Sequence, residues 1–334
     1  MLDGKPFDLA ADRLDLFAAG DTLIAQSGST GLVRSTDQGR TWTSVELPRR
    51  RDTAHPLVLQ RFGEAVVTFM SEQPAGPSHI WTTTDGEHWK GGEPLTLPET
   101  ADGLTAVGGE LPDGRLIIPL GSDDGPEQAL VSGDDGSTWQ VAPCPAVAAR
   151  EEFGCMGLTS GGEGLWLTLH YVSLDEGRTW QRFEVAPDPE PTGDEQLRGI
   201  VPLAGGGWLG TVTDVVVKDG SLAEVRYVAR SDDGLTWAPA IEHPCNGLPD
   251  IYGEGFSPPA AFGDAGWVTA IDCKRAGKVA RSELYRLGPD GRDPKLLDTL
   301  EDGSFGTPAA SGDVVVVPET DGNELRLRRL QPTG

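Results

Sequence analysis

The sequence predicts an all-β propeller made of four-stranded antiparallel blades. Three observations lead to this prediction: an octapeptide recurs along the chain, the interval between copies reads as four short strands, and turn-forming residues are frequent. The 334 residues include 45 Gly and 26 Pro, which interrupt the chain every few positions and favour short strands over long helices. We expect a single propeller domain over residues 1–334.

The octapeptide has the pattern S-x-D-x-G-x-T-W. It is complete at residues 35–42, 132–139 and 173–180, and the copy at 230–237 differs only at its first position. Degenerate copies stand at 82–89 and from Leu287 onward. The third positions of successive copies lie 41 to 57 residues apart, a spacing typical of propeller blades.

Turn chemistry accounts for each residue type in the octapeptide. The Asp side chain accepts backbone N–H bonds, Gly supplies a positive φ, and Trp packs its ring against the blade as the fourth strand begins. The motif therefore predicts a structural link between the third and fourth strands, far from the axis where propellers bind ligands. The residues assigned to this role are Asp37, Trp42, Asp134, Trp139, Asp175, Trp180, Asp232 and Trp237.

The spacing assigns six blades directly, and the rest of the chain supplies a seventh. The six blades are expected at about 14–48, 56–98, 105–145, 154–188, 197–244 and 255–300. Residues 304–334 read as three more strands, and a fourth from the N-terminus, near residues 5–10, would close the ring and remove exposed sheet edges. Seven blades are favoured, with six as the alternative. The fourth blade is short and is expected to be abbreviated at one rim.

The octapeptide resembles the Asp-box, also called the bacterial neuraminidase repeat. This repeat occurs in sialidases, sortilin-type receptors, a photosystem II assembly factor and some glycoside hydrolases. The resemblance implies a sialidase-like propeller over most of the chain, but it does not decide the activity, because propellers with this repeat include both enzymes and binding proteins. Sialidases of the family have six blades, so a count of seven departs from them.

Charge and composition exclude several classes of partner. The formal charge of −25 opposes binding to nucleic acids and to anionic membranes. The chain has no run of about 18 apolar residues and no visible signal peptide. We expect a soluble monomer, cytoplasmic as given or trimmed from a secreted protein.

Long polar loops lead into the first strand of several blades, and we expect a ligand site where these loops meet at an acidic central mouth. The ligand would be a glycan, a peptide or a small metabolite. The residues expected to contact it are Arg150, Glu151, Glu195, Asp250 and Glu301. Two alternatives remain open: a diverged glycoside hydrolase, lyase or transferase at the same mouth, and an assembly scaffold that uses its outer rim.

The resemblance to sialidases suggests which residues an enzyme would use. Sialidases employ a Tyr nucleophile backed by a Glu, and three Arg that clamp the substrate carboxylate. Here Tyr252, Glu254, Arg198 and Glu152 are the candidate catalytic residues. The family's Arg-Ile-Pro motif is absent and the order of Tyr and Glu differs, so conventional sialidase chemistry is not expected.

No cofactor is expected. The five His lack paired metal spacing. The acidic segment 122–127 could hold Ca²⁺, which is the alternative, but it lacks a fixed carboxylate register. The four Cys contain no CxxC pair; a Cys144–Cys155 bridge is one possibility. Cys155 and Cys245 lie on the loops near the mouth, where a thiol nucleophile is the alternative to a small buried Cys.

Overall fold

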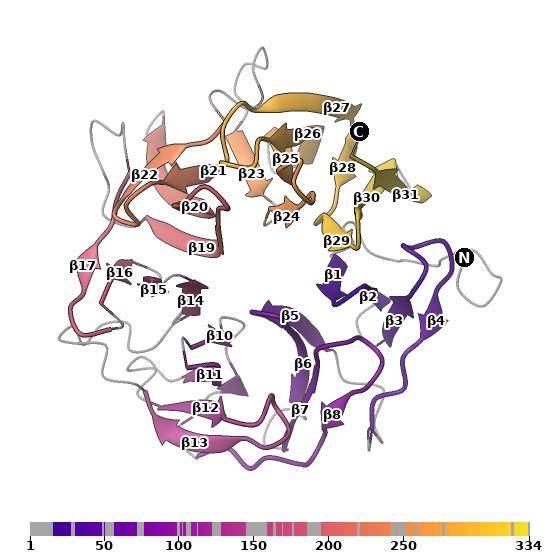
Figure 1. Ribbon diagram of the computed structural model, residues 1–334, viewed down its shortest axis with the longest axis vertical. Helices are drawn as coiled ribbons and strands as arrows, with labels where there is room; N and C mark the ends of the chain where they lie inside the picture. Colours follow the sequence, from indigo (N-terminus) through magenta and orange to yellow (C-terminus); the bar gives the residue numbers. More distant parts are fainter. Residues whose placement is uncertain are drawn as a thin grey trace. The chain divides into compact units, whose positions relative to one another are not determined.

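Short β-strands form the computed structural model, and none of the described residues is helical. The structure describes residues 16–27, 31–48, 50, 57–71, 77–98, 101, 103–104, 108–111, 113–121, 128–144, 159–162, 165–168, 170–175, 177–185, 195–218, 221–241, 245, 252–256, 259–275, 278–321 and 324–332. The strands form seven sheets, mostly four-stranded and antiparallel. The chain is therefore an all-β seven-bladed propeller, which confirms the predicted fold class and the preferred blade count (Figure 1).

The chain divides into two compact units near residue 180. The first unit holds the sheets β1-β2-β3-β4, β5-β6-β7-β8 and β10-β11-β12-β13, and its chain continues into β14-β15-β16-β17. Their strands are β1 (Leu16–Ala19), β2 (Thr22–Ser27), β3 (Gly31–Ser35), β4 (Thr43–Ser44), β5 (Val58–Phe62), β6 (Ala65–Ser71), β7 (Ser78–Thr83), β8 (Lys90–Gly91), β9 (Gly103–Leu104), β10 (Gly109–Glu110), β11 (Leu116–Gly121), β12 (Gln128–Ser132), β13 (Gln140–Pro143), β14 (Thr159–Gly162), β15 (Leu165–Leu167), β16 (Tyr171–Ser173) and β17 (Gln181–Arg182).

The second unit holds three sheets, with strand orders β18-β22-β21-β20-β19, β23-β25-β26-β27 and β28-β30-β29. Two further strands complete the pairing: β24 pairs with β25, and β31 pairs with β30. The strands are β18 (Glu184–Val185), β19 (Gln196–Pro202), β20 (Trp208–Lys218), β21 (Ser221–Ser231), β22 (Thr236–Pro239), β23 (Tyr252–Phe256), β24 (Ala260–Ala261), β25 (Trp267–Arg275), β26 (Lys278–Leu287), β27 (Lys295–Glu301), β28 (Gly303–Phe305), β29 (Ala309–Ser311), β30 (Val314–Asp321) and β31 (Glu324–Leu330).

Two blade boundaries differ from the sequence prediction. Residues 184–185 were assigned to the fourth blade, but β18 pairs in parallel with β22 of the following sheet. The sixth blade begins at Tyr252, within a segment predicted to be a loop. At Tyr252 the local polarity favoured a loop, and in both places backbone pairing with another strand of the sheet decided the structure. The N-terminal strand predicted near residues 5–10 lies outside the described residues.

The hydrophobic core lies between successive sheets within each unit. In the first unit, Ile24 of the first sheet packs in one cluster with Val66 and the fully buried Trp81 of the second. In the second unit, Val268 and Leu284 cluster with Phe305 of the next sheet. Because these neighbouring sheets pack face to face, their central strands read as nearly continuous apolar runs.

The first strands of several sheets are irregular. The first strand is divided in two in the third, sixth and seventh sheets, where β9 and β10, β23 and β24, and β28 and β29 share a partner strand. Pro259 and Pro308 stand in two of these breaks, and proline cannot donate to a β-ladder. Strand β19 stays continuous but shifts register between Arg198 and Val201. Strands β19 and β23 carry three of the sequence-predicted site residues, Arg198, Tyr252 and Glu254.

Candidate functional site

Three octapeptide turns share one hydrogen-bond pattern, seen at Asp175. Its carboxylate accepts hydrogen bonds from Ser173 Oγ at 2.8 Å, Thr179 N at 2.7 Å and Thr179 Oγ1 at 2.7 Å. Trp180 Nε1 donates to the Gly177 carbonyl at 3.0 Å. The bonds from Thr179 and Ser173 lower the pKa of Asp175 to about 2, so the carboxylate stays charged and fully engaged. The same carboxylate bonds recur at Asp37 and Asp134.

The turn of the fifth blade corrects the sequence alignment. Asp232 was assigned as the turn residue, but Asp233 accepts the bonds, from Ser231 Oγ at 3.1 Å and Thr236 N at 2.8 Å. The Asp and Gly are adjacent here, so this turn is one residue shorter. The second blade has the same short form, with Asp85 as its acceptor. The octapeptide pattern concealed the difference because Asp occupies both positions 232 and 233.

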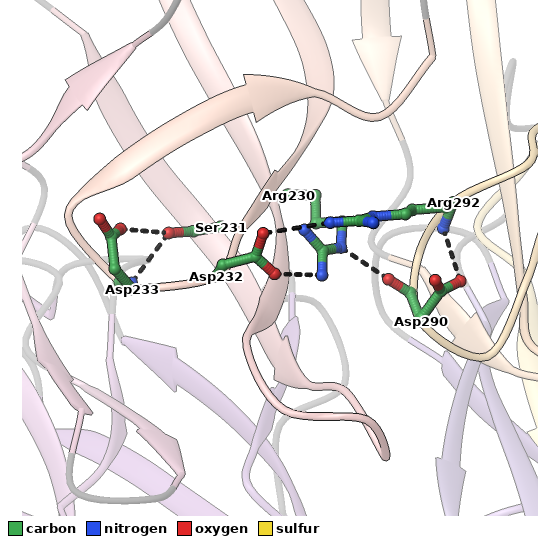
Figure 2. A network of polar contacts seen from close by, with 7 residues as sticks. Arg230, Ser231, Asp232, Asp233, Asp290 and Arg292 are labelled. Atoms are coloured by element: carbon green, nitrogen blue, oxygen red, sulfur yellow. Dashed lines mark hydrogen bonds and ion pairs between the residues drawn. The ribbon is translucent and has the colours of Figure 1, made fainter.

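Asp232 is thereby released from the turn and joins two arginines (Figure 2). One carboxylate oxygen contacts Arg230 Nη2 and the other accepts from Arg292 Nη2 at 3.2 Å. Arg230 Nε also donates to the Asp290 carbonyl of the next sheet at 2.7 Å. The hydrogen bond and the charge of Arg230 lower the pKa of Asp232. Arg230, Asp232 and Arg292 line a cavity of about 670 Å³.

The candidate catalytic residues of the second unit lie on first strands. Arg198 is on β19 opposite Thr211, and Tyr252 is on β23 opposite Lys274. Both strands shift register at these points, between Arg198 and Val201 and between Gly253 and Phe256. Glu254 lies inside the second irregularity. Bulges re-aim side chains and occur often beside active sites, although they also occur at ordinary sheet edges.

The candidate ligand contacts fall into three groups. Glu195 is buried, and its Oε2 atom lies 3.0 Å from Nη2 of Arg182, so an internal ion pair holds it. Glu301 is exposed at the end of β27. The remaining predicted positions lie outside the described residues; they are Arg150, Glu151, Glu152, Asp250, Cys155 and the segment 122–127.

The structure assembles a Tyr, Glu and Arg trio that the sequence analysis missed. Glu283 on β26 is buried and contacts Arg281 Nη2 at 2.7 Å. Tyr285 donates its hydroxyl proton to Glu283 at 2.7 Å. Burial and this hydrogen bond raise the pKa of Tyr285, so the phenol stays protonated and is unsuited to be a nucleophile. The sequence R-S-E-L-Y at residues 281–285 could have indicated this trio, because alternate residues of a strand share one face.

A disulfide joins Cys245 to Cys273 beside this trio. The Cys245 amide donates to Glu283 Oε2 at 3.0 Å, and the residue has a φ of 65°, a left-handed conformation uncommon outside Gly. Cys273 lies opposite Gly253 of β23, so the disulfide ties Cys245 to the strand that pairs with β23. The thiol-nucleophile hypothesis for Cys245 is therefore wrong.

The two sulfur atoms also lie close to a buried carboxylate, an arrangement that resembles a metal site. The two sulfurs and a Glu283 oxygen lie within 4.8 Å of one another, the one such group of buried ligand atoms among the described residues. Because the sulfurs are bonded to each other, they are not available as thiolate ligands. Cys144 is also disulfide-bonded, and its predicted partner Cys155 lies outside the described residues.

Among the described residues, no helix has the length and apolarity needed to span a membrane. No protein-family model matches the chain, and no curated protein sequence matches it.

Solved structures share the fold at low sequence identity. Ycf48 bound to a D1 peptide has a TM-score of 0.54 and 15% identity, over 98% of this chain and 94% of that one. The β-propeller domain of Cps50 (Swd1) from Myceliophteria thermophila gives 0.52 and 12%, over 96% and 98%. A GH74 xyloglucanase from Xanthomonas campestris gives 0.50 and 15%, over 96% of this chain and 55% of that one. At these identities the similarity establishes the propeller fold alone.

Proposed function

We propose that this propeller is a binding protein that recognises an extended peptide through the first strands of its second unit. One observation carries the proposal: β19 and β23 both break register at Arg198 and after Gly253. A bulge leaves backbone groups outside the ladder and turns nearby side chains in new directions. A peptide requires both features, because its backbone needs hydrogen-bond partners and its side chains need specific contacts.

Charge indicates the kind of peptide. The protein carries a formal charge of −25, which attracts cationic ligands and repels anionic ones. Glu254 would meet a Lys or Arg side chain of the ligand, and Tyr252 would pack against its apolar part. The solved Ycf48 structure holds a peptide on a propeller of the same fold, which supports this class of ligand.

The contacts among Tyr285, Glu283 and Arg281 favour a binding role over a catalytic one. Tyr285 and Glu283 bond to each other, and Arg281 pairs with the same carboxylate inside the core. An enzyme of the sialidase kind would instead need Tyr252, Glu254 and Arg198 to converge within hydrogen-bond reach. A fluorogenic sialoside assay of the wild type and of Tyr252→Phe tests that alternative, and we expect no turnover from either.

The binding proposal can be tested by fluorescence anisotropy. Two labelled pools of ten-residue peptides, one rich in Lys and one rich in Glu, are titrated with the protein at 50 mM and 300 mM salt. We expect the Lys-rich pool to bind and to weaken at the higher salt. Tyr252→Ala and Glu254→Gln should each weaken binding about tenfold, equivalent to about 1.4 kcal/mol.

Glu184→Gln is the matched control, because Glu184 lies on β18 at the opposite side of its sheet from β19. This variant should bind like the wild type. Absence of binding by both pools, or equal affinities for the wild type and the Tyr252 and Glu254 variants, would contradict the proposal.

A further inference from the structure

The turn of the fifth blade carries charged residues that its structural role does not require. The second blade contains the same short turn, in which Thr83 and Asp85 stand at the positions of Ser231 and Asp233. In that turn, Thr82 and Thr84 occupy the positions of Arg230 and Asp232. Because Thr suffices at both positions, the turn itself requires neither the arginine nor the second Asp of the fifth blade.

The two arginines already hold a carboxylate in a bridging geometry. Asp232 presents one oxygen to each guanidinium group, and Arg230 is fixed from behind by the Asp290 carbonyl (Figure 2). The Arg230 side chain is only 14% exposed, whereas those of Asp232 and Arg292 are 64% and 57% exposed. The guanidinium group of Arg230 is therefore fixed in position. The carboxylate of Asp232 is exposed enough to move out into solvent.

The cavity beside this cluster offers apolar contacts. Its volume is about 670 Å³, and Ala238, Pro239 and Pro294 contribute to its walls. Cavities of this size accept a small organic group. We propose that this cavity is a binding site for a carboxylate that carries a small apolar group, and that such a ligand displaces Asp232 from Arg230 and Arg292.

The charges around the cavity favour a carboxylate over phosphate. Asp233 and Asp293 also line the cavity, and Asp290 accepts a hydrogen bond from the Arg292 amide at 3.2 Å. With Asp232 displaced, Asp233 and Asp293 remain in the cavity lining and Asp290 remains beside Arg292. A phosphate dianion meets more repulsion there than a single carboxylate does, and a planar carboxylate matches the guanidinium fork.

The test compares N-acetyl-leucine with N-acetyl-leucinamide, which differ by the carboxylate alone. Binding is followed by saturation-transfer NMR and isothermal titration calorimetry. Asp232→Thr removes the internal competitor and keeps a residue that the equivalent turn tolerates. We expect this variant to bind N-acetyl-leucine about tenfold more tightly than the wild type, because the ligand no longer has to break the charged hydrogen bonds of Asp232. Adding Arg292→Gln should abolish that gain, and inorganic phosphate should not compete.

Two further comparisons complete the test. Thr84→Ala in the equivalent turn of the second blade should leave the affinity unchanged. N-acetyl-Ala-Ala-Leu distinguishes the source of the carboxylate: tighter binding than N-acetyl-leucine indicates a peptide chain end, and equal binding indicates a free organic acid. Asp232→Asn provides the same comparison if Asp232→Thr does not fold.

The proposal is overturned if a folded Asp232 variant binds N-acetyl-leucine no more tightly than the wild type. It is also overturned if the amide binds as well as the acid.

Discussion

At the scale of single residues, the recurring Asp acts as a hydrogen-bond acceptor that fixes a turn. Asp175 accepts three bonds from Ser173 and Thr179, and these bonds explain its low pKa. The same residue type at position 232 has an unrelated role, because the shorter turn uses Asp233. The role of an Asp is therefore set by turn length and not by its place in a sequence pattern.

Asp175→Asn should change how stability depends on pH. The pKa of Asp175 is about 2 in the folded protein, below the ordinary 3.8, so the unfolded chain takes up the proton first as pH falls. The carboxylate therefore contributes stability above about pH 4, and this contribution is lost as pH falls toward 2. Thermal unfolding from pH 7 to pH 2.5 should show the variant less stable at pH 7, with the difference shrinking below pH 4.

Asp313→Asn is the control, because Asp313 is exposed in the turn between β29 and β30. A constant difference between Asp175→Asn and the wild type over the whole pH range would show that the turn bonds do not depend on the charge.

At the scale of elements, the turns also pack successive blades together. A Cβ atom at Gly136 would lie 2.0 Å from Thr82 Oγ1 on the third strand of the preceding blade. Gly114 has a similar φ, +82° against +78°, but a Cβ there would meet nothing within 4 Å. Alanine substitutions at these two glycines separate two free-energy costs: that of the backbone conformation and that of the contact between blades.

Gly114→Ala should lower the free energy of unfolding by about 1 kcal/mol, the cost of a Cβ in a left-handed conformation. Gly136→Ala should lower it by a further 1–3 kcal/mol or so, because the added methyl group overpacks the contact with β7. Urea denaturation measures both values. Equal losses would mean that the blades can separate at this turn without cost.

The disulfide acts on a whole strand. The double variant Cys245→Ser, Cys273→Ser removes the disulfide between Cys245 and the strand that pairs with β23. Its free energy of unfolding should be lower than that of the wild type by about 3 kcal/mol. Hydrogen exchange should become faster over Tyr252–Phe256 and stay unchanged over Val58–Phe62 in the first unit. Unchanged exchange over Tyr252–Phe256 would show that Glu283 and strand pairing hold this segment without the disulfide.

At the scale of the whole molecule, the repeat made the fold predictable and left the site largely unpredictable. The spacing of the octapeptide indicated six blades, because turn residues report backbone geometry locally, and the strand-like residues 304–334 indicated the seventh. The bulges at Arg198 and Gly253 depend on pairing with strands distant in sequence, and no local pattern signals them. The Cys245–Cys273 link escaped prediction for the same reason, since it joins a loop to a neighbouring strand.

The central claim is that the first strands of the second unit bind a peptide. Hydrogen exchange followed by mass spectrometry, with and without the Lys-rich peptide pool, tests this claim most directly. We predict slower exchange on adding peptide over Gln196–Pro202 and Tyr252–Phe256, with no change over Lys295–Glu301 of the outer strand β27. Protection confined to Lys295–Glu301, or no protection in the second unit while the peptide is bound, would contradict the account.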